Sequence, residues 1–400
     1  MSHLEEFRMY VRNWLEENAP KSIRGLARDP NMAYWGGKKS PLPFPEAKEW
    51  LEIMAAKGWT VPFWPKEYGG GGLTKEENKI FNEEMARLEL PPPLVGFGIT
   101  MIGPTILQYG TEEQKKKFIG EIVRGEVRWC QGYSEPNAGS DLANIQTKAV
   151  EDGDDYIVNG QKIWTSYGDL ADWMFMLVRT DTTVKKQAGI TFLLVDMSTP
   201  GIEVRPIKLI SGSSPFCEVF FTDVRVPKKN VLGRVNGGWE VAKALLGHER
   251  SMIAMTFGGR TTTKTKENPL EAAAKKYIGL QDGKVAHPVI RDRMAQNQMD
   301  ETCFLLTVQR NDDNVKAGHR PGPESSIFKI YGTELNQRRM ELMLSIMGPE
   351  CLGWEGEGFD ADELDVCRVW LRSRGNTLEG GTSEIQLNII AKQVLGLPDR

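Results

Sequence analysis

Two glutamates flank a glycine pair near the carboxyl end of the chain. LEGGTSEIQ (378–386) places Glu379 and Glu384 around this pair, just ahead of an apolar helical run. A desolvated glutamate has a raised pKa and suits general-base chemistry. The alternative is that Glu379 is solvated and that Glu384 only begins a helix. The choice depends on residues elsewhere in the chain.

A third carboxylate lies in LLGHERSMIA. Helical spacing puts Glu249 on the same apolar stripe as three other residues, Val241, Leu245 and Met252. A glutamate on a buried stripe needs a partner or a function. Either it pairs with Arg250 or a neighbouring helix, or it is a base.

A short loop and a strand-like segment offer groups that could bind a ligand. SEPNAGSD (134–141) carries the hydroxyls of Ser134 and Ser140, and the backbone around Gly139 can approach a ligand closely or bind anionic oxygens. Taken alone, a surface turn is the simpler interpretation. In KIWTS (162–166) a tryptophan stands beside two hydroxyls, and its ring either packs in a β core or stacks on a planar cofactor.

Several familiar signatures are missing. GGKKS (36–40) lacks the spacing of a Walker A loop, and no GxGxxG follows a strand. His248 and Glu249 begin like HExxH, but the fifth position is Met252. There is no GxSxG elbow. The four histidines are too dispersed to suggest a metal cluster, so we expect no metal.

The composition is that of a globular protein. The 400 residues, with 40% hydrophobic and 26% charged, are enough for two or three packed units. A formal charge of -4 gives no basic face for nucleic acid, and no apolar run is long enough to insert in a membrane. Residues 1–18 predict an amphipathic helix with acids, unlike a secretion or transit signal. Five scattered cysteines suit a reducing cytoplasm.

Three zones must position these groups, and together they predict an α+β fold that is mostly α. Residues 1–125 show helical periodicity, with Thr111 as a helix cap. Residues 126–236 hold short β runs without intervening helices, which predicts an antiparallel barrel or sandwich with a hairpin turn at Asn159-Gly160. Residues 237–400 predict a four-helix bundle.

SEPNAGSD, YIVNGQKIWTS, EVFFTDVRVP and GGTSEIQ, in this order, resemble the acyl-CoA dehydrogenase family along essentially the whole chain. The resemblance implies non-covalently bound FAD and α,β-dehydrogenation of an acyl-CoA to the trans-2-enoyl-CoA, with electrons passed to an electron-transfer flavoprotein. The flavin ring would lie near Tyr133, Ser134 and Trp164, the reactive nitrogen near Ser166, and the adenosine half near Thr382 and Glu384. SIMGPEC matches the family's glycine-rich QIFGGNG only at Ile346 and Gly348. The implied cofactor-binding residues are Gln131, Tyr133, Ser134, Gly139, Ser140, Trp164, Thr165, Ser166, Gly348, Thr382 and Glu384.

The family's catalytic base occupies one of two places, either before the Gly-Thr of the final motif or on the first helix of the bundle. Matching GTSEIQ puts Gly380, not Glu379, at the first place. The second place is Glu249, which the resemblance therefore implies as the base. The implied substrate-binding residues are Ser140, Arg250 and Gly380.

The chain also departs from the common pattern. AAAKKYIGLQDGKVAHPVIRDRM (272–294) lacks the family's Arg-x-x-Phe-Gly element, and Leu387 stands where many relatives carry arginine. Such departures resemble bacterial members that act on bulky acyl-CoAs, including steroid side-chain and aromatic-degradation enzymes, as homodimers, homotetramers or α2β2 heteromers. Two alternatives remain: a flavin monooxygenase or oxidase on the same scaffold, and a non-catalytic partner subunit.

Overall fold

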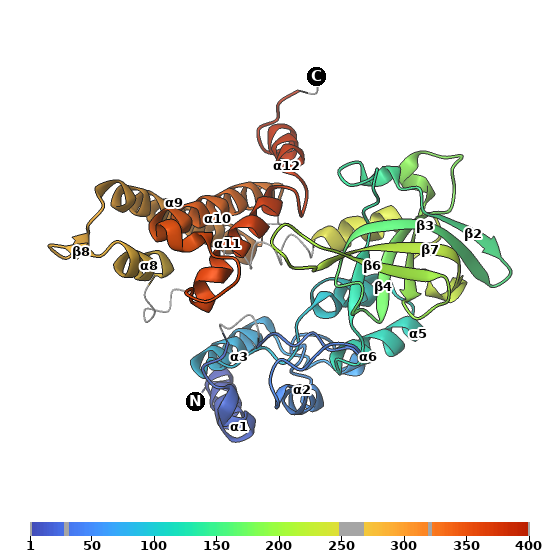
Figure 1. Ribbon diagram of the computed structural model, residues 1–400. Helices are drawn as coiled ribbons and strands as arrows, with labels where there is room; N and C mark the ends of the chain where they lie inside the picture. Colours follow the sequence, from blue (N-terminus) through green and yellow to red (C-terminus); the bar gives the residue numbers. More distant parts are fainter. Residues whose placement is uncertain (1, 28–31, 248–267, 319–321, 399–400) are drawn as a thin grey trace. The chain divides into compact units, whose positions relative to one another are not determined.

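The computed structural model describes residues 2–27, 32–247, 268–318 and 322–398. The chain divides into two compact units, Met1–Ile207 with Pro215–His248, and Lys208–Ser214 with Glu249–Arg400 (Figure 1).

The amino-terminal part of the first unit is helical, as predicted. Its helices are α1 (His3–Asn18), α2 (Ala47–Ala56), α3 (Lys75–Arg87), a π-helical turn (Gly98–Ile102), α4 (Gly103–Tyr109), α5 (Glu112–Gln114), a second π-helical turn (Lys115–Ile119) and α6 (Gly120–Val123). The predicted Thr111 cap is confirmed, because its hydroxyl accepts the Gln114 N–H and the Gln114 side chain accepts the Thr111 N–H. Apolar side chains from α1, α2 and α3 share one core, including Val11, Leu15, Trp50, Met54 and Phe81.

One buried carboxylate joins α1 to α3. Glu84 is only 1% exposed, and its oxygens accept hydrogen bonds from Arg8 (3.1 Å), Arg12 (2.9 and 3.0 Å) and Arg87 (2.8 Å). These guanidinium groups, Arg12 foremost, hold the pKa of Glu84 down at about 2. A buried charge with this many partners fixes how the two helices meet.

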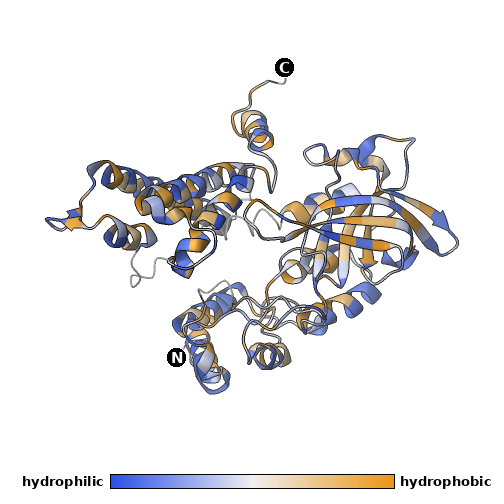
Figure 2. Ribbon diagram, in the orientation of Figure 1, coloured by the Kyte–Doolittle hydropathy of each residue, from blue (hydrophilic) through white to orange (hydrophobic). Residues whose placement is uncertain are grey.

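A seven-stranded sheet follows (Figure 1). Its strands are β1 (Trp129–Gly132), β2 (Lys148–Asp152), β3 (Asp155–Ser166), β4 (Trp173–Arg179), β5 (Ile190–Asp196), β6 (Ile202–Ile207) and β7 (Phe216–Pro227). The order is β1-β4-β2-β3-β7-β6, and β5 pairs with β4. Most neighbours are antiparallel as predicted, but β4 runs parallel to β1, and Arg179 at its end pairs in parallel with Lys148 at the start of β2. The apolar run of β4 is buried along its whole length, and Figure 2 shows the apolar residues of the sheet in orange.

The predicted hairpin turn at Asn159-Gly160 is wrong. Both residues lie inside β3, and the β2–β3 turn is formed by Gly153 and Asp154. The register against β7 shifts between Val158 and Gly160, so the pair forms a β-bulge. A Cβ on Gly160 would lie 2.5 Å from the Thr147 hydroxyl. The residue types that favour a tight turn here serve a bulge and a close approach between strands.

The second unit is helical. It contains α8 (Pro269–Tyr277), the short strands β8 (Leu280–Gln281) and β9 (Lys284–Val285), α9 (Pro288–Lys316), α10 (Ser325–Met347), α11 (Ala361–Ser373) and α12 (Ser383–Ile389), which runs into a π-helical turn (Ile390–Val394). Helices α8, α9, α11 and α12 all contact α10. Within the first unit, residues 238–247 are also helical, as predicted for the start of the carboxy-terminal bundle.

Candidate functional site

The loop SEPNAGSD begins two residues beyond the end of β1. The Glu135 N–H and the Ala138 N–H each donate to the other residue's carbonyl (3.2 and 3.0 Å), which closes a tight turn. Gly139 and Ser140 follow the turn and are exposed, and a Cβ on Gly139 would meet no atom within 4 Å. The far side of the loop is therefore open and presents its backbone and the Ser140 hydroxyl.

A buried ion pair fixes this loop to β3. Lys162 is fully buried in β3, and its ammonium donates to Glu135 (2.7 Å) and to the Tyr133 carbonyl (3.2 Å). The other hydrogen bonds of Glu135 come from the backbone N–H groups of Gln146 (2.5 Å) and Thr147 (3.0 Å). Burial lowers the pKa of Lys162 to about 8, and the nearby Glu135 carboxylate opposes the shift. Because the carboxylate is fully partnered, the loop has one defined conformation.

A second buried cation holds the continuation of the loop. Arg179, at the end of β4, donates to the carbonyls of Ala143 (2.6 Å), Ile145 (3.3 Å) and Lys186. Burial lowers the pKa of this guanidinium. The loop is thus anchored at both of its ends by side chains of the sheet.

The KIWTS segment ends β3 beside the loop. The Ile163 N–H donates to the Ser134 carbonyl at 2.9 Å, so the two predicted segments do lie together. Trp164 is 54% exposed, its backbone is left-handed at φ 61°, and its ring stands edge-on to Phe216 at 6.1 Å. A bulky residue with positive φ marks strain that the fold must stabilise, and such strain is common at ligand sites. Ser166 is half-buried at the strand end.

Three predicted residues contribute less side-chain surface than expected. Tyr133 is buried, and its ring packs edge-on against Phe175 and Phe192 in the core. Thr165 is also fully buried, and its hydroxyl has no hydrogen-bond partner among the described residues. Gln131 lies within β1 and is half-buried. At Tyr133 and Thr165, contact with a ligand at the loop surface is restricted to the backbone.

Three predicted residues of the second unit lie at the start of α12, whereas Gly348 lies at the end of α10. Thr382 caps the helix by accepting the Ile385 N–H at 3.3 Å. Gly380 has φ 64°, and its carbonyl accepts the Gln386 side-chain amide at 3.0 Å. Glu384 is exposed, and hydrogen bonds from its own backbone N–H and from Thr382 lower its pKa. Gly348, also with positive φ, ends α10.

Glu379 is engaged by two partners. Its carboxylate accepts hydrogen bonds from Arg372 (2.6 Å) and from the Asn376 side-chain amide (2.5 Å). The Glu379 carboxylate is therefore directed to those two donors. The predicted base Glu249 and the predicted substrate contact Arg250 lie outside the described residues.

The sequence analysis did not identify Glu135, Lys162 and Arg179 as parts of the site. A signal for Lys162 was present, because a lysine at a core-facing position of a strand requires a buried partner. The partner itself could not be inferred, since Glu135 lies 27 residues away along the chain.

Among the described residues, no group of three or more His, Cys, Asp or Glu side chains could hold a metal ion. In the same part of the chain, no helix combines the length and apolar character needed to span a membrane.

Family models match most of the chain in three consecutive segments. Residues 2–126 match the acyl-CoA dehydrogenase N-terminal domain, residues 130–224 the middle domain, and residues 236–395 the C-terminal domain.

Curated proteins and solved structures agree with these models. The chain is 35% identical over 402 residues to acyl-CoA dehydrogenase IpdE1 of Mycobacterium tuberculosis, a match that covers all of this chain and 99% of the relative. It is similar to the structure titled Tcur3481-Tcur3483 steroid ACAD, with a TM-score of 0.76, 29% identity and coverage of 99% and 98%. It is also similar to the ChsE4-ChsE5 complex of Mycobacterium tuberculosis, with a TM-score of 0.71, 30% identity and coverage of 100% and 99%.

Proposed function

Because the chain belongs to the acyl-CoA dehydrogenase family of flavoprotein oxidoreductases, we propose that it binds FAD and converts an acyl-CoA to the trans-2-enoyl-CoA. The observation that carries this proposal is the surface formed by the loop after β1 and by the end of β3. There, the exposed ring of Trp164 lies beside a loop that the buried Glu135–Lys162 pair holds in place.

The residues of this surface fit a flavin. An exposed aromatic ring offers a stacking face, and the half-buried hydroxyls of Ser134 and Ser166 offer hydrogen bonds to ring atoms. The open side of the loop at Gly139 and Ser140 leaves room for a phosphate-bearing group. In the second unit, the family pattern assigns Thr382 and Glu384 to the adenosine half and Gly348 to a further cofactor contact. When bound, FAD supplies the acceptor for the hydride that leaves the β-carbon of the substrate.

Glu249 is the base in this proposal. Gly380 has no side chain at the other place where the family carries a base, and the neighbouring Glu379 is bound by Arg372 and Asn376. Glu249 would take the α-proton of the thioester, which the polarised carbonyl makes acidic. The Gly380 backbone N–H would hold the thioester oxygen, and Ser140 and Arg250 would contact the substrate.

The wider assignments follow from the same family pattern. Domains 1–125, 126–236 and 237–400 would form a helical, a β and a helical part, with electrons passing to an electron-transfer flavoprotein in the cytoplasm. The assembly would be a homodimer, a homotetramer or an α2β2 heteromer. The titles of two relatives, Tcur3481-Tcur3483 and ChsE4-ChsE5, name pairs of chains, which favours the heteromer.

Two alternatives make different predictions. A flavin monooxygenase or oxidase on this scaffold would be reoxidised rapidly by air after reduction. A non-catalytic partner subunit would be colourless even after incubation with FAD. The loop held by the Glu135–Lys162 pair and the exposed Trp164 ring disfavour a non-catalytic partner subunit.

The test is anaerobic reduction of the reconstituted protein. We expect yellow protein that releases FAD on acid precipitation and whose visible flavin band bleaches with an acyl-CoA but not with the matching free acid. The CoA moiety supplies binding energy far from the reacting carbons, so its removal should abolish turnover. A protein that takes up no flavin, or that a free acid reduces equally well, would contradict the proposal.

A further inference from the structure

A buried arginine lies between two aromatic rings just before β1. Arg128 is 5% exposed, and its guanidinium carbon is 4.6 Å from the centre of the Trp35 ring and 4.7 Å from that of Tyr167. Both distances are within the range of cation–π attraction. Burial lowers the pKa of this guanidinium, which shows how poorly the site replaces water around the charge.

No carboxylate pairs with this charge among the described residues. Asp169 and Asp172 attract the charge without forming a salt bridge, and the Asp172 carboxylate instead accepts the backbone N–H groups of Arg128 (2.9 Å) and Lys38 (3.2 Å). The only side-chain hydrogen bond of the guanidinium in this part of the chain goes to the Ser40 hydroxyl at 2.9 Å. A guanidinium has five donors, so Arg128 retains hydrogen-bonding capacity.

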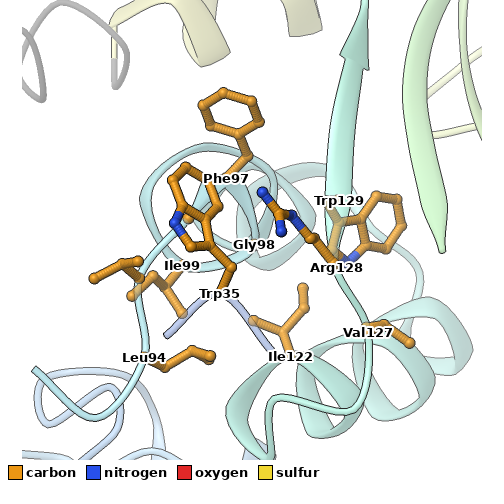
Figure 3. Close-up of a pocket in the computed structure, with 11 residues that line it drawn as sticks. Trp35, Leu94, Phe97, Gly98, Ile99, Ile122, Val127, Arg128 and Trp129 are labelled. Atoms are coloured by element: carbon orange, nitrogen blue, oxygen red, sulfur yellow. The ribbon is translucent and has the colours of Figure 1, made fainter. Parts of the chain in front are cut away.

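A small cavity lies beside Arg128, which is one of its lining residues (Figure 3). It holds about 10 Å³, which is the space of one water-sized atom. Its walls include Trp35, Phe97, Ile99, Ile122 and Trp129. Arg128 is the only charged residue among the described residues that line it.

Half-exposed aromatic rings gather around Arg128. Trp35 meets Phe97 edge-on at 5.9 Å and Tyr167 at 5.3 Å, and all three residues are half-buried. Gly96 packs so closely on Trp35 that a Cβ there would lie 2.7 Å from the indole ring. Aromatic side chains left partly open to solvent around a buried cation are typical of a ligand site.

The cavity adjoins the candidate flavin surface in the same unit. Tyr167 directly follows Ser166 and also has a left-handed backbone, with φ 50°. Trp129 begins β1, the strand that leads to Ser134. The aromatic cluster around Arg128 is therefore joined directly to the candidate flavin surface through Tyr167 and Ser166.

We propose that Arg128 is a specificity-determining residue that binds an oxygen atom on a ring-bearing acyl group. The inference rests on the proposed function and names its substrate class: an acyl-CoA with an apolar ring and a ketone or carboxylate oxygen at the end far from the thioester. The rings of Trp35, Phe97 and Tyr167 contact the apolar part. The oxygen replaces the water-sized volume and accepts hydrogen bonds from the guanidinium.

Arg128 also has a purely structural interpretation, in which its side chain only fixes residues 35–40 to the sheet. The two roles differ in what they do to substrate preference. Loss of a structural contact lowers the stability of the protein and lowers the rates with all substrates alike. Loss of a specificity contact changes the ratio between substrates that differ by one oxygen.

The experiment measures anaerobic flavin reduction with cyclohexylpropanoyl-CoA and with its ring-ketone and ring-carboxylate analogues. In the wild type we expect kcat/KM for at least one oxygenated analogue to exceed that of the parent by about ten- to a hundredfold, as one hydrogen bond to a charged donor allows. Arg128→Met should reduce this ratio to about one, mainly through KM. Ser40→Ala, which removes only the hydrogen bond between Arg128 and the Ser40 hydroxyl, should preserve the ratio.

The outcomes separate the two proposals. If no acyl-CoA bleaches the flavin, the proposed function fails and this inference fails with it. If all three substrates reduce the wild-type protein equally, only the role of Arg128 is overturned, and this result does not depend on any variant folding. A preference that survives in Arg128→Met also overturns it, and thermal unfolding of each variant shows whether the fold is intact.

Discussion

Trp164 combines two features that rarely occur together at one residue. Its ring is 54% exposed, and its backbone has φ 61°. A left-handed conformation costs a bulky residue about 1–3 kcal/mol. An exposed ring does not recover this cost through burial in the protein itself. A planar ligand on the ring face would do so.

Trp164→Ala should therefore weaken FAD binding without destabilising the protein that lacks FAD. Stacking of a base on an aromatic side chain contributes about 1–3 kcal/mol, so we expect roughly a ten- to hundredfold higher Kd for FAD. Titration of the FAD-free protein with FAD measures the Kd, and thermal unfolding measures stability. Phe63→Ala, at another exposed aromatic residue (59% exposed), is the control and should leave the Kd unchanged. An unchanged Kd in Trp164→Ala would exclude the stacking role.

Lys162→Met should affect both stability and FAD binding. Removing one partner of a buried pair leaves Glu135 uncompensated, which typically costs about 3–5 kcal/mol, and the loop would lose its anchor. We expect a lower thermal midpoint and a lower FAD content. Adding Glu135→Gln should recover part of the midpoint, because no charge is then left buried.

Lys228→Met is the matched control for the buried pair. Lys228 pairs with Glu151 at 2.8 Å, but both side chains are solvent-accessible, so the change should cost less than about 1 kcal/mol. If Lys162→Met were as stable and as rich in FAD as Lys228→Met, the anchoring role would be refuted.

At the scale of elements, the contact between α1 and α3 depends on the ionised form of Glu84. Its folded pKa of about 2 lies below the usual 4.5. The resulting stabilisation is complete above the usual pKa and is lost as the pH falls toward 2.

Glu84→Gln should lower the free energy of opening of α1 by about 2 kcal/mol at neutral pH, because hydrogen bonds to a charged acceptor become neutral ones. Hydrogen exchange of α1 amides measures this, with α10 as the internal control. The difference between wild type and variant should shrink as the pH falls from about 4.5 toward 2. A difference independent of pH would mean that the charge is not what joins the helices.

The elements themselves could largely be predicted from the sequence. Helical periodicity and the Thr111 cap predicted the helix at 112–123, and the apolar runs predicted β3 to β7. The predicted turn at Asn159-Gly160 was wrong, because asparagine and glycine suit a bulge as well as a turn. The parallel pairing of β1 with β4 was also missed, since period-two patterns show which face is buried but not which strands are neighbours.

For the whole molecule, the resemblance to acyl-CoA dehydrogenases is confirmed by family models along nearly the entire chain. The motif pairs SEPNAGSD and KIWTS do lie together, as the hydrogen bond from Ile163 to Ser134 shows. The sequence could not reveal the buried charged side chains that hold these segments in place. Glu135, Lys162 and Arg179 are distant along the chain, and only the fold brings them together.

In the proposed mechanism, Glu249 removes the α-proton and Glu379 does not. Its most direct test is single-turnover anaerobic flavin reduction by a reactive acyl-CoA in wild type, Glu249→Gln and Glu379→Gln, each with its FAD content measured. Glutamine is nearly isosteric but cannot accept the proton, so flavin reduction in Glu249→Gln should slow by about a hundred- to ten-thousandfold with FAD retained. Glu379→Gln should stay close to wild type in rate. A fully active Glu249→Gln, or an inactive Glu379→Gln that retains its FAD, would contradict the account.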